Sequence, residues 1–117
     1  MTKVTSFNEG GITVIEPKGE LIGGSETDEL RNAIDSAVAG GNMKLVIDLA
    51  KVHYVNSTAL GLLTSTHVNY VKRKGRVVLC NVEKQIHSIF VITRLVLLFE
   101  VYGNQNEALA SFSQQAT

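Results

Sequence analysis

The sequence predicts an α/β domain with a mixed β-sheet of about five strands and about four helices. Residues 8–11, "NEGG", join two short apolar segments, and Asn and Gly favour the tight reversal of an antiparallel hairpin. Beyond the hairpin, strand-like apolar segments alternate with segments of helical periodicity, and such crossovers require parallel neighbours. The 117 residues, of which 44% are hydrophobic, are enough for one core without metals or disulfides. A single domain over residues 1–117 is therefore expected.

The first part of the chain is expected to have a β-β-α order. The opening hairpin pairs Val4–Phe7 with Ile12–Ile15. The clearest helix follows, with Ser25 as its N-cap and apolar residues at helical spacing. The pair Gly40 and Gly41 ends this helix, since glycine readily adopts the conformation that follows a helical C-terminus.

A β-α-β unit is expected in the middle of the chain. Residues 44–49, "KLVIDL", are a nearly continuous apolar strand, as found inside a sheet that is covered by helices. The next helix should begin at Asn56 or Ser57, and "KRKG" at residues 72–75 supplies a cationic last turn and a glycine stop. Residues 76–82, "RVVLCNV", return as a second buried strand.

The last third of the chain continues the alternation. Residues 83–95 have helical periodicity, residues 97–103 resemble a strand, and residues 104–114 form a C-terminal helix. The run "LVLLF" at residues 95–99 has no polar residue at a helix-to-strand junction. We expect this run to be partly buried at the start of the strand and partly an exposed apolar patch.

Charge and composition exclude several kinds of partner. Lys plus Arg balance Asp plus Glu at 11 each, and the basic residues are scattered, so neither a nucleic acid nor a membrane surface is an expected partner. The N-terminus lacks the apolar segment of a signal peptide, and the longest apolar stretch is interrupted by Arg94. The single cysteine, Cys80, lies in an apolar run and is typical of a small buried residue in a reducing compartment. A cytoplasmic protein is expected.

The chain carries no clear catalytic or cofactor motif. A phosphate-binding P-loop and the G-x-S-x-G elbow of hydrolases are both absent. His53, His67 and His87 are far apart in the sequence, and one cysteine cannot complete a metal site with them. We therefore expect no cofactor, no metal and no enzymatic activity.

Two adjacent hydroxyl residues, Ser57 and Thr58, stand where a strand becomes a helix. One interpretation is structural, because a hydroxyl or amide at this place caps the first-turn N–H groups of the helix. The other is functional, because a hydroxyl beside a positive helix terminus is a favourable position for an added phosphate. One residue can do both, so spacing alone leaves the two interpretations open.

The same stretch resembles a known family. Residues 45–63, "LVIDLAKVHYVNSTALGLL", are similar to the signature of the STAS domain of bacterial anti-sigma factor antagonists. In that family an apolar strand ending in Asp-Leu leads to an Asp-Ser-Ser/Thr-Gly-Leu-Gly turn and a helix. The flanks follow the family's order too: residues 19–30 match its Gly-x-Leu loop, residues 75–82 its fourth strand, and residues 98–112 its last strand and helix.

The resemblance implies a function and a set of site residues. Ser57 corresponds to the serine that a partner anti-sigma factor with serine kinase activity phosphorylates, and a phosphatase would restore the free serine. The unphosphorylated form would bind the anti-sigma factor and free the sigma factor, whereas the phosphorylated form would not. Asn56, Thr58, Ala59 and Gly61 would form the interaction surface around Ser57.

Two differences from the family pattern keep alternatives open. Asn56 stands where the family usually has Asp, and Ala59 where it usually has Gly, which would add a methyl group to an exposed turn. A STAS scaffold that is never phosphorylated, and a STAS module that binds a small anion such as a nucleotide, are the alternative functions. A weak homodimer is a further alternative for the assembly.

Overall fold

The chain opens with the predicted hairpin in the computed structural model, which describes residues 4–113. β1 (Val4–Glu9) pairs antiparallel with β2 (Ile12–Leu21), and the register places Glu9 opposite Ile12. Gly10 and Gly11 have φ angles of +59° and +85°, a region in which side chains are strained, so glycine is required at this reversal. The antiparallel opening is confirmed.

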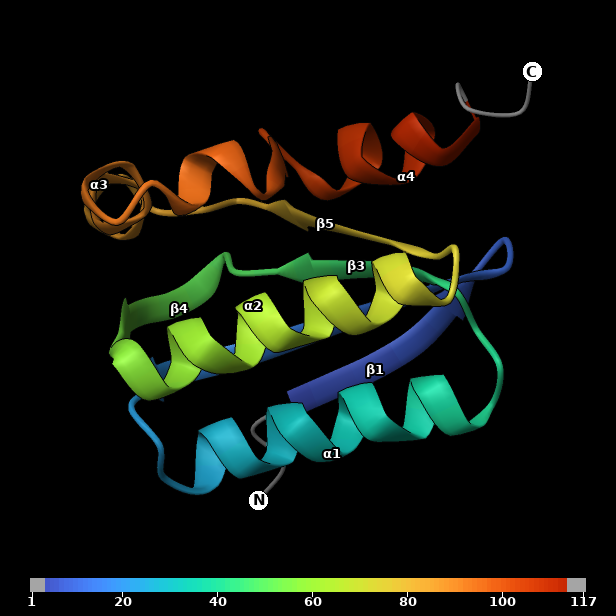
Figure 1. Cartoon of the computed structure of the whole chain (residues 1–117), viewed down its shortest axis with the longest axis horizontal. Coiled ribbons are helices and arrows are strands. Elements are labelled where there is room, and N and C mark those ends of the chain that lie inside the picture. The colour runs from blue at the N-terminus through green and yellow to red at the C-terminus, as the bar shows by residue number, and fades with distance from the viewer. Residues whose placement is uncertain (1–3, 114–117) are drawn as a thin grey trace.

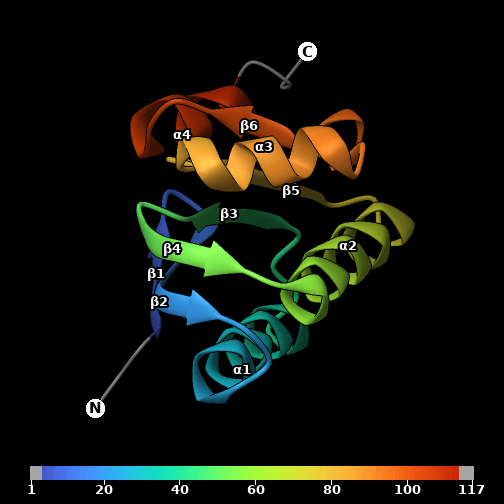
Figure 2. The ribbon, with the colours of Figure 1, turned by 90° about the vertical axis from the view of Figure 1, so that its left-hand side faces the viewer.

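The sheet contains six strands in the described residues, in the order β1-β2-β3-β5-β6, with β4 beside the second half of β2. All pairs after the hairpin are parallel. Figure 2 shows β4 running alongside β2 beyond the end of β3. The strands after the hairpin are β3 (Lys44–Asp48), β4 (Lys51–Val55), β5 (Arg76–Cys80) and β6 (Glu100–Tyr102).

The sixth strand arises because the chain turns sharply between β3 and β4. Asp48 accepts a hydrogen bond from the backbone N–H of Ala50 at 2.9 Å, and the N–H of Val52 donates to the carbonyl oxygen of Leu49 at 3.0 Å. This tight turn moves the chain sideways, so that β4 pairs with the far half of the ten-residue strand β2. Its last residue, Val55, leads directly into the next helix.

Helices cover both faces of the sheet. Figure 1 shows α1 (Ser25–Ala39) and α2 (Ser57–Lys72) side by side along the sheet, with α4 (Gln105–Ser113) on its other side. Alternate strand residues point to opposite faces, which divides the core in two. α1, α2 and α3 (Lys84–Ile92) pack on the face that contains Ile15, Leu45, Ile47, Val77 and Leu79, whereas α4 packs on Val14, Val46, Val78 and Cys80. No helix within residues 4–113 has the length and apolar character needed to cross a bilayer.

The start of α1 differs from the prediction. The N-cap is Gly24, and Ser25 is the first helical residue, with its hydroxyl donating to Glu26 Oε1 at 3.0 Å rather than capping a backbone N–H. The loop is held instead by the N–H of Gly23, which donates to the Thr27 hydroxyl at 2.9 Å. The prediction of a Ser25 cap is wrong because a residue inside the helix ties down the loop. The predicted end of the helix at Gly40 is confirmed.

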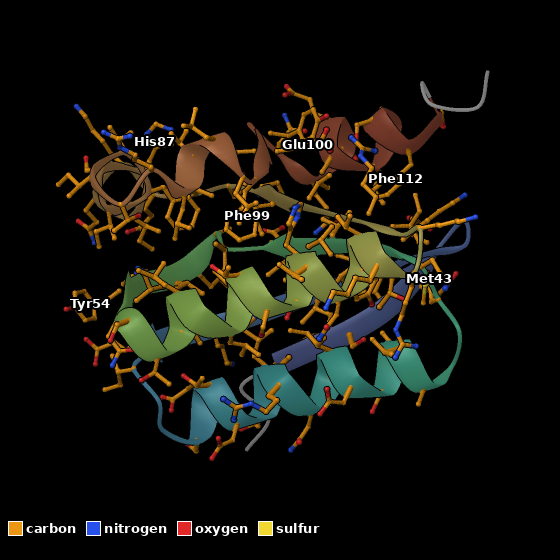
Figure 3. All side chains as sticks on the ribbon, in the orientation of Figure 1. Met43, Tyr54, His87, Phe99, Glu100 and Phe112 are labelled. Atoms are coloured by element: carbon orange, nitrogen blue, oxygen red, sulfur yellow. The ribbon has the colours of Figure 1, made fainter. Side chains whose placement is uncertain are left out.

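The apolar run at residues 95–99 is divided between core and surface. Leu95–Leu97 form a short 3-10 helix, η1, and Leu97 is 83% exposed, whereas Phe99 is 5% exposed and packs in the core. Figure 3 shows Phe99 pointing between the last part of the chain and α2. The mixed burial is as predicted, but the segment turns before the strand instead of extending into it. The predicted last residue of the C-terminal helix, residue 114, lies outside the described residues.

Candidate functional site at the N-terminus of α2

Asn56 organises the turn between β4 and α2. Its backbone N–H donates to the carbonyl oxygen of Leu21 at 3.1 Å, directly after the last β2–β4 pair. Its side-chain nitrogen donates to the carbonyl oxygen of Ile22 at 2.9 Å, and its side-chain oxygen accepts from the N–H of Ala59 at 3.2 Å. One side chain thus caps α2 and ties the helix to the loop that joins β2 to α1.

The double role explains why an amide suits this position. An amide carries both a donor and an acceptor, whereas an ionised carboxylate only accepts. Aspartate at position 56 would keep the bond from Ala59 but could not donate to Ile22, which lies 34 residues earlier in the chain. The difference from the family pattern at Asn56 therefore has a structural reason in this chain.

Ser57 is the first residue of α2, and its side chain is exposed. Asn56, not Ser57, is the N-cap, so the serine hydroxyl has no structural role in starting the helix. Within residues 4–113 the hydroxyl makes no hydrogen bond. α2 has 16 residues, and its first turn contains no acidic residue. No carboxylate of that turn therefore offsets the positive end of the helix dipole. The Ser57 side chain is thus free to react beside a positive helix terminus.

The neighbours of Ser57 are not equivalent. Thr58 and Gly61 are exposed, and Thr58 lies against the loop from β2, since a Cβ on Gly23 would be 3.5 Å from its Cγ2 atom. Ala59, by contrast, is fully buried in the main core. The expectation that the Ala59 methyl group lies on an exposed turn is therefore wrong: one turn of a helix brings the third residue to the sheet side. Its side chain cannot form part of an interaction surface.

Two large apolar side chains lie beside this helix terminus. Ile22 is 47% exposed and Tyr54 is 49% exposed. Asn56 donates a hydrogen bond to the carbonyl oxygen of Ile22, and Tyr54 lies in β4, two residues before Asn56. Figure 3 shows Tyr54 at the end of the molecule where α2 begins. The sequence analysis did not identify this pair, because only the β2–β4 pairing brings Ile22 close to residues 54–58. Alternation along "KVHYV" would place Tyr54 on the same face as the buried Val52, but the burial pattern of β4 breaks this alternation, and the β2–β4 register shifts between Gly19 and Glu20.

Polar contacts from α3 hold the other side of β4. The ring nitrogen Nδ1 of His53 is 3.0 Å from Glu83 Oε1, and the Gln85 side chain donates to the carbonyl oxygen of His53 at 2.7 Å. Glu83 is the N-cap residue of α3, and Gln85 lies in the first turn of that helix. Their two contacts with His53 hold β4, the strand that leads into the Asn56 turn. His53 is therefore a positioning contact and not a second functional group beside Ser57.

Reactive chemistry elsewhere in the described chain is limited. Burial raises the pKa of the Cys80 thiol to about 12, with the nearby carboxylates of Asp48 and Glu16 adding to the effect, so the thiol stays protonated. Residues 4–113 contain no group of three or more His, Cys, Asp or Glu residues arranged to hold a metal ion. The arrangement at the start of α2 is suited to two events: accepting a phosphate on Ser57 and docking a partner over a partly apolar surface.

Comparison with known proteins gives the same family as the sequence signature. The family model of the STAS domain matches residues 6–108. BtrV of Bordetella bronchiseptica, whose description is that of an anti-sigma factor antagonist, is 22% identical over 92 residues that cover 79% of each chain.

Solved structures show the same fold. A Thermotoga maritima protein, also described as an anti-sigma factor antagonist, superposes with a TM-score of 0.85 at 17% identity over 92% of both chains. SpoIIAA has been solved unphosphorylated and, as the Bacillus protein, phosphorylated, and the TM-score is 0.73 for each form. The unphosphorylated form is 16% identical and covers 96% of this chain and 98% of its own, and the phosphorylated form is 18% identical and covers 93% and 98%.

Proposed function

Because this chain belongs to the STAS domain family, we propose that it is an anti-sigma factor antagonist that binds its partner at the start of α2. In this proposal the unphosphorylated chain sequesters an anti-sigma factor with serine kinase activity. Phosphorylation of Ser57 by that kinase ends the interaction, and a phosphatase reverses it. The chain itself is a cytoplasmic binding protein and not an enzyme.

The main observation behind the proposal is that Asn56 and Ser57 have different roles at the start of α2. Asn56 supplies the cap that the helix needs, so the fold makes no demand on the Ser57 hydroxyl. The hydroxyl is exposed and lies where the helix dipole favours a negative charge. A residue that has no structural role, at a position suited to phosphate, is the arrangement expected of a modification site.

Phosphate on Ser57 should act on the interface and leave the fold intact. A phosphoserine carries about −1.5 to −2 charges, and the helix terminus stabilises a nearby anion by about 0.3–1 kcal/mol. Against a docked partner the same charge must lose its water, which costs several kcal/mol unless the charge is paired. Since 1.4 kcal/mol is about tenfold in affinity, a loss of about two to three orders of magnitude is expected. The equal TM-scores of the two SpoIIAA forms support tolerance of phosphate by this fold.

The proposed partner surface combines the polar turn with an apolar border. Asn56, Ser57, Thr58 and Gly61 supply its polar and small residues; Asn56 is half-buried, and the other three are exposed and accessible to a partner. Ile22 and Tyr54 add apolar area, of the kind that supplies most of the binding energy at protein interfaces.

Affinity capture and binding measurements test this proposal. Wild type is used to capture partners from a bacterial lysate, and the affinity of the identified partner is then measured for Ser57→Ala, Ser57→Asp and the control Ser36→Asp. Ser36 is exposed on α1, outside the proposed surface. We expect only Ser57→Asp to lose binding, with a melting temperature close to that of wild type. Equal binding by all four proteins, or phosphate found only on Thr58 after incubation with ATP and the partner, would refute the switch.

A scaffold without phosphorylation is the second candidate, and Asn56 favours it. The neutral amide at position 56 removes the acidic neighbour that the family pattern places beside the serine. If the captured partner binds Ser57→Asp as tightly as wild type and never transfers phosphate, the scaffold function is the correct one.

A further inference from the structure

The outer edge of β1 is open. β1 is the first strand in the order of the sheet and pairs only with β2 in the described part of the chain. The pairing runs from Val4 to Glu9 without a bulge, and residues 5–9 are all exposed. Figure 2 shows β1 at the left-hand border of the ribbon, with no described helix or strand on its outer side. Within residues 4–113 the strand therefore has one free side along its length.

The alternation of an antiparallel ladder decides which backbone groups of β1 point outward. The two-residue turn between β1 and β2 is closed by the pair Glu9 and Ile12, so the N–H and C=O groups of Glu9 face β2. Every second residue back along the strand does the same, and the residues between them face away from β2. The outward-facing backbone groups belong to Val4, Ser6 and Asn8.

Other edges of the sheet are better protected than this one. β6 has only three residues, and its first residue, Glu100, is held in an ion pair by Arg76. On β4, the carbonyl oxygen of His53 already accepts a hydrogen bond from the Gln85 side chain at 2.7 Å. Soluble proteins usually block a long edge with lysine, proline or a bulge. β1 has six residues and none of these three devices.

The space beside β1 is also open on the side of α1. A groove of about 370 Å³ lies between the strand and this helix. Its lining consists of Ala33, Ser36 and Ala37 of α1, Ser6, Phe7 and Asn8 of β1, and Thr13 of β2. Because alanine and serine are short, this side of α1 leaves the edge of β1 uncovered, as the approach of a further strand requires.

We propose that this edge pairs with the same edge of a second copy of the chain, antiparallel and related by a two-fold axis at Ser6. In this alignment Ser6 lies opposite Ser6 of the second copy, and Val4 lies opposite Asn8. Each such pair exchanges two backbone hydrogen bonds, because all three residues have outward-facing groups. The two six-stranded sheets then form one continuous sheet. This inference goes beyond the proposed antagonist function and uses no residue of the surface around Ser57.

The side chains and charges of the two edges are compatible. Phe7, which is 37% exposed, lies opposite Thr5 of the second copy and diagonal to its Phe7, within reach of an aromatic contact. Glu9 is the one charged residue of β1 and falls opposite position 3 of the second copy, which is a lysine. The formal net charge of the chain is zero, so two copies do not repel each other at long range. A second copy is therefore an occupant that matches this edge in both backbone and charge.

The association should be weak and should stop at the dimer. Stable complexes use about 20–30 residues on each partner, many more than a single strand supplies, so we expect a dissociation constant on the order of 0.1–1 mM. A two-fold pairing uses each β1 once. The opposite edge, at β6, is short and unlike β1, so it offers no equivalent site for a third copy.

Sedimentation equilibrium of the full chain between about 10 µM and about 1 mM tests the proposal, and we expect a monomer–dimer equilibrium without larger species. Ser6→Lys should weaken dimerisation about fivefold or more, because like charges directly opposite one another destabilise a strand pair. Ser88→Lys is the matched control, since Ser88 is exposed on α3, and it should associate as wild type does. A chain that stays monomeric at about 1 mM, or an equal effect of the two lysines, overturns the proposal and leaves a segment of another protein as the occupant of this edge.

Cross-linking tests the alignment of the two strands. The Cα atoms of a hydrogen-bonded antiparallel pair are about 5.5 Å apart, which is within the range of a disulfide, so Ser6→Cys should oxidise to a covalent dimer. The native Cys80 is buried, and burial raises the pKa of its thiol to about 12, so it does not compete. Ser88→Cys should stay monomeric under the same oxidant. Equal cross-linking of these two variants, or faster cross-linking of Phe7→Cys than of Ser6→Cys, contradicts the two-fold axis at Ser6.

Discussion

Replacing Asn56 tests whether one side chain holds the candidate site together. Asn56→Ala removes the cap on Ala59 and the bond to the Ile22 carbonyl. A lost N-cap costs about 1 kcal/mol and a lost hydrogen bond costs about 1 kcal/mol, and Ile22 is exposed enough for water to reach its carbonyl. We therefore expect a loss of about 2 kcal/mol in the free energy of unfolding.

Asn56→Asp separates the two bonds. The carboxylate still caps Ala59 and gains about 0.3–1 kcal/mol from the helix dipole, but it loses the bond to Ile22, worth about 1 kcal/mol, and places an oxygen opposite a carbonyl oxygen. The net loss should be about 0.5–1 kcal/mol, less than that of Asn56→Ala. The family pattern at this position is thus expected to be less stable in this chain than its own asparagine.

Urea denaturation with linear extrapolation measures both differences, provided that the slope with denaturant stays constant across the variants. Each 1 kcal/mol should also lower the melting temperature by about 4 °C for a chain of this size. Asn69→Ala is the control, since Asn69 is an exposed residue of the same helix with no side-chain hydrogen bond in the described chain, and it should be near neutral. If Asn56→Asp is more stable than wild type, or Asn56→Ala loses less than about 0.5 kcal/mol, the two hydrogen bonds of the Asn56 side chain do not stabilise the fold as argued.

Four further expectations concern residues outside the Asn56 turn. Ser25→Ala should change stability by less than about 0.5 kcal/mol in urea denaturation, because Ser25 is not a cap; a loss near 1 kcal/mol would restore the sequence-based interpretation. Leu97→Lys should leave stability unchanged in the same assay, because 83% of the side chain is exposed, and a large loss would show hidden packing. Cys80 should resist a thiol reagent at pH 8 until the protein unfolds, since its pKa is raised to about 12; rapid labelling of native protein would disagree. A hydrogen bond and ion pair with Arg76 lower the pKa of Glu100, so wild type should lose a small stabilisation as pH falls below about 5, and Glu100→Gln should abolish that part of the pH dependence.

The direction of the pH dependence at Glu100 is set by which state, folded or unfolded, binds the proton more tightly. With a lowered pKa in the folded state, Glu100 is ionised and paired above its unfolded pKa, and the stabilisation is present there. As pH falls toward the folded pKa, the unfolded chain takes up the proton first, and stability decreases. The side chain of Glu100 is 47% exposed, so solvent screening keeps the contribution small.

The sequence alone determined the elements whose signals are local. Alternating apolar residues and paired glycines predicted the hairpin, and helical periodicity predicted the positions of four helices. The start of α2 at Asn56 or Ser57 was also predicted, since capping depends on residues within one turn. The resemblance to the STAS signature makes Ser57 the candidate phosphorylation site, because the motif is contiguous in the chain; this assignment stays a prediction.

Tertiary structure alone decided the features that depend on distant residues. The cap residue, Asn56, is held by Ile22 through the β2–β4 pairing, and no pattern within residues 45–63 contains that partner. Ala59 is buried because α2 lies flat on the sheet, which a turn motif does not specify. A groove of about 280 Å³, lined by residues of both helices, exists only where α1 and α2 face each other. Local sequence sets backbone conformation, whereas burial and the pairing of polar groups are set by which elements the fold brings together.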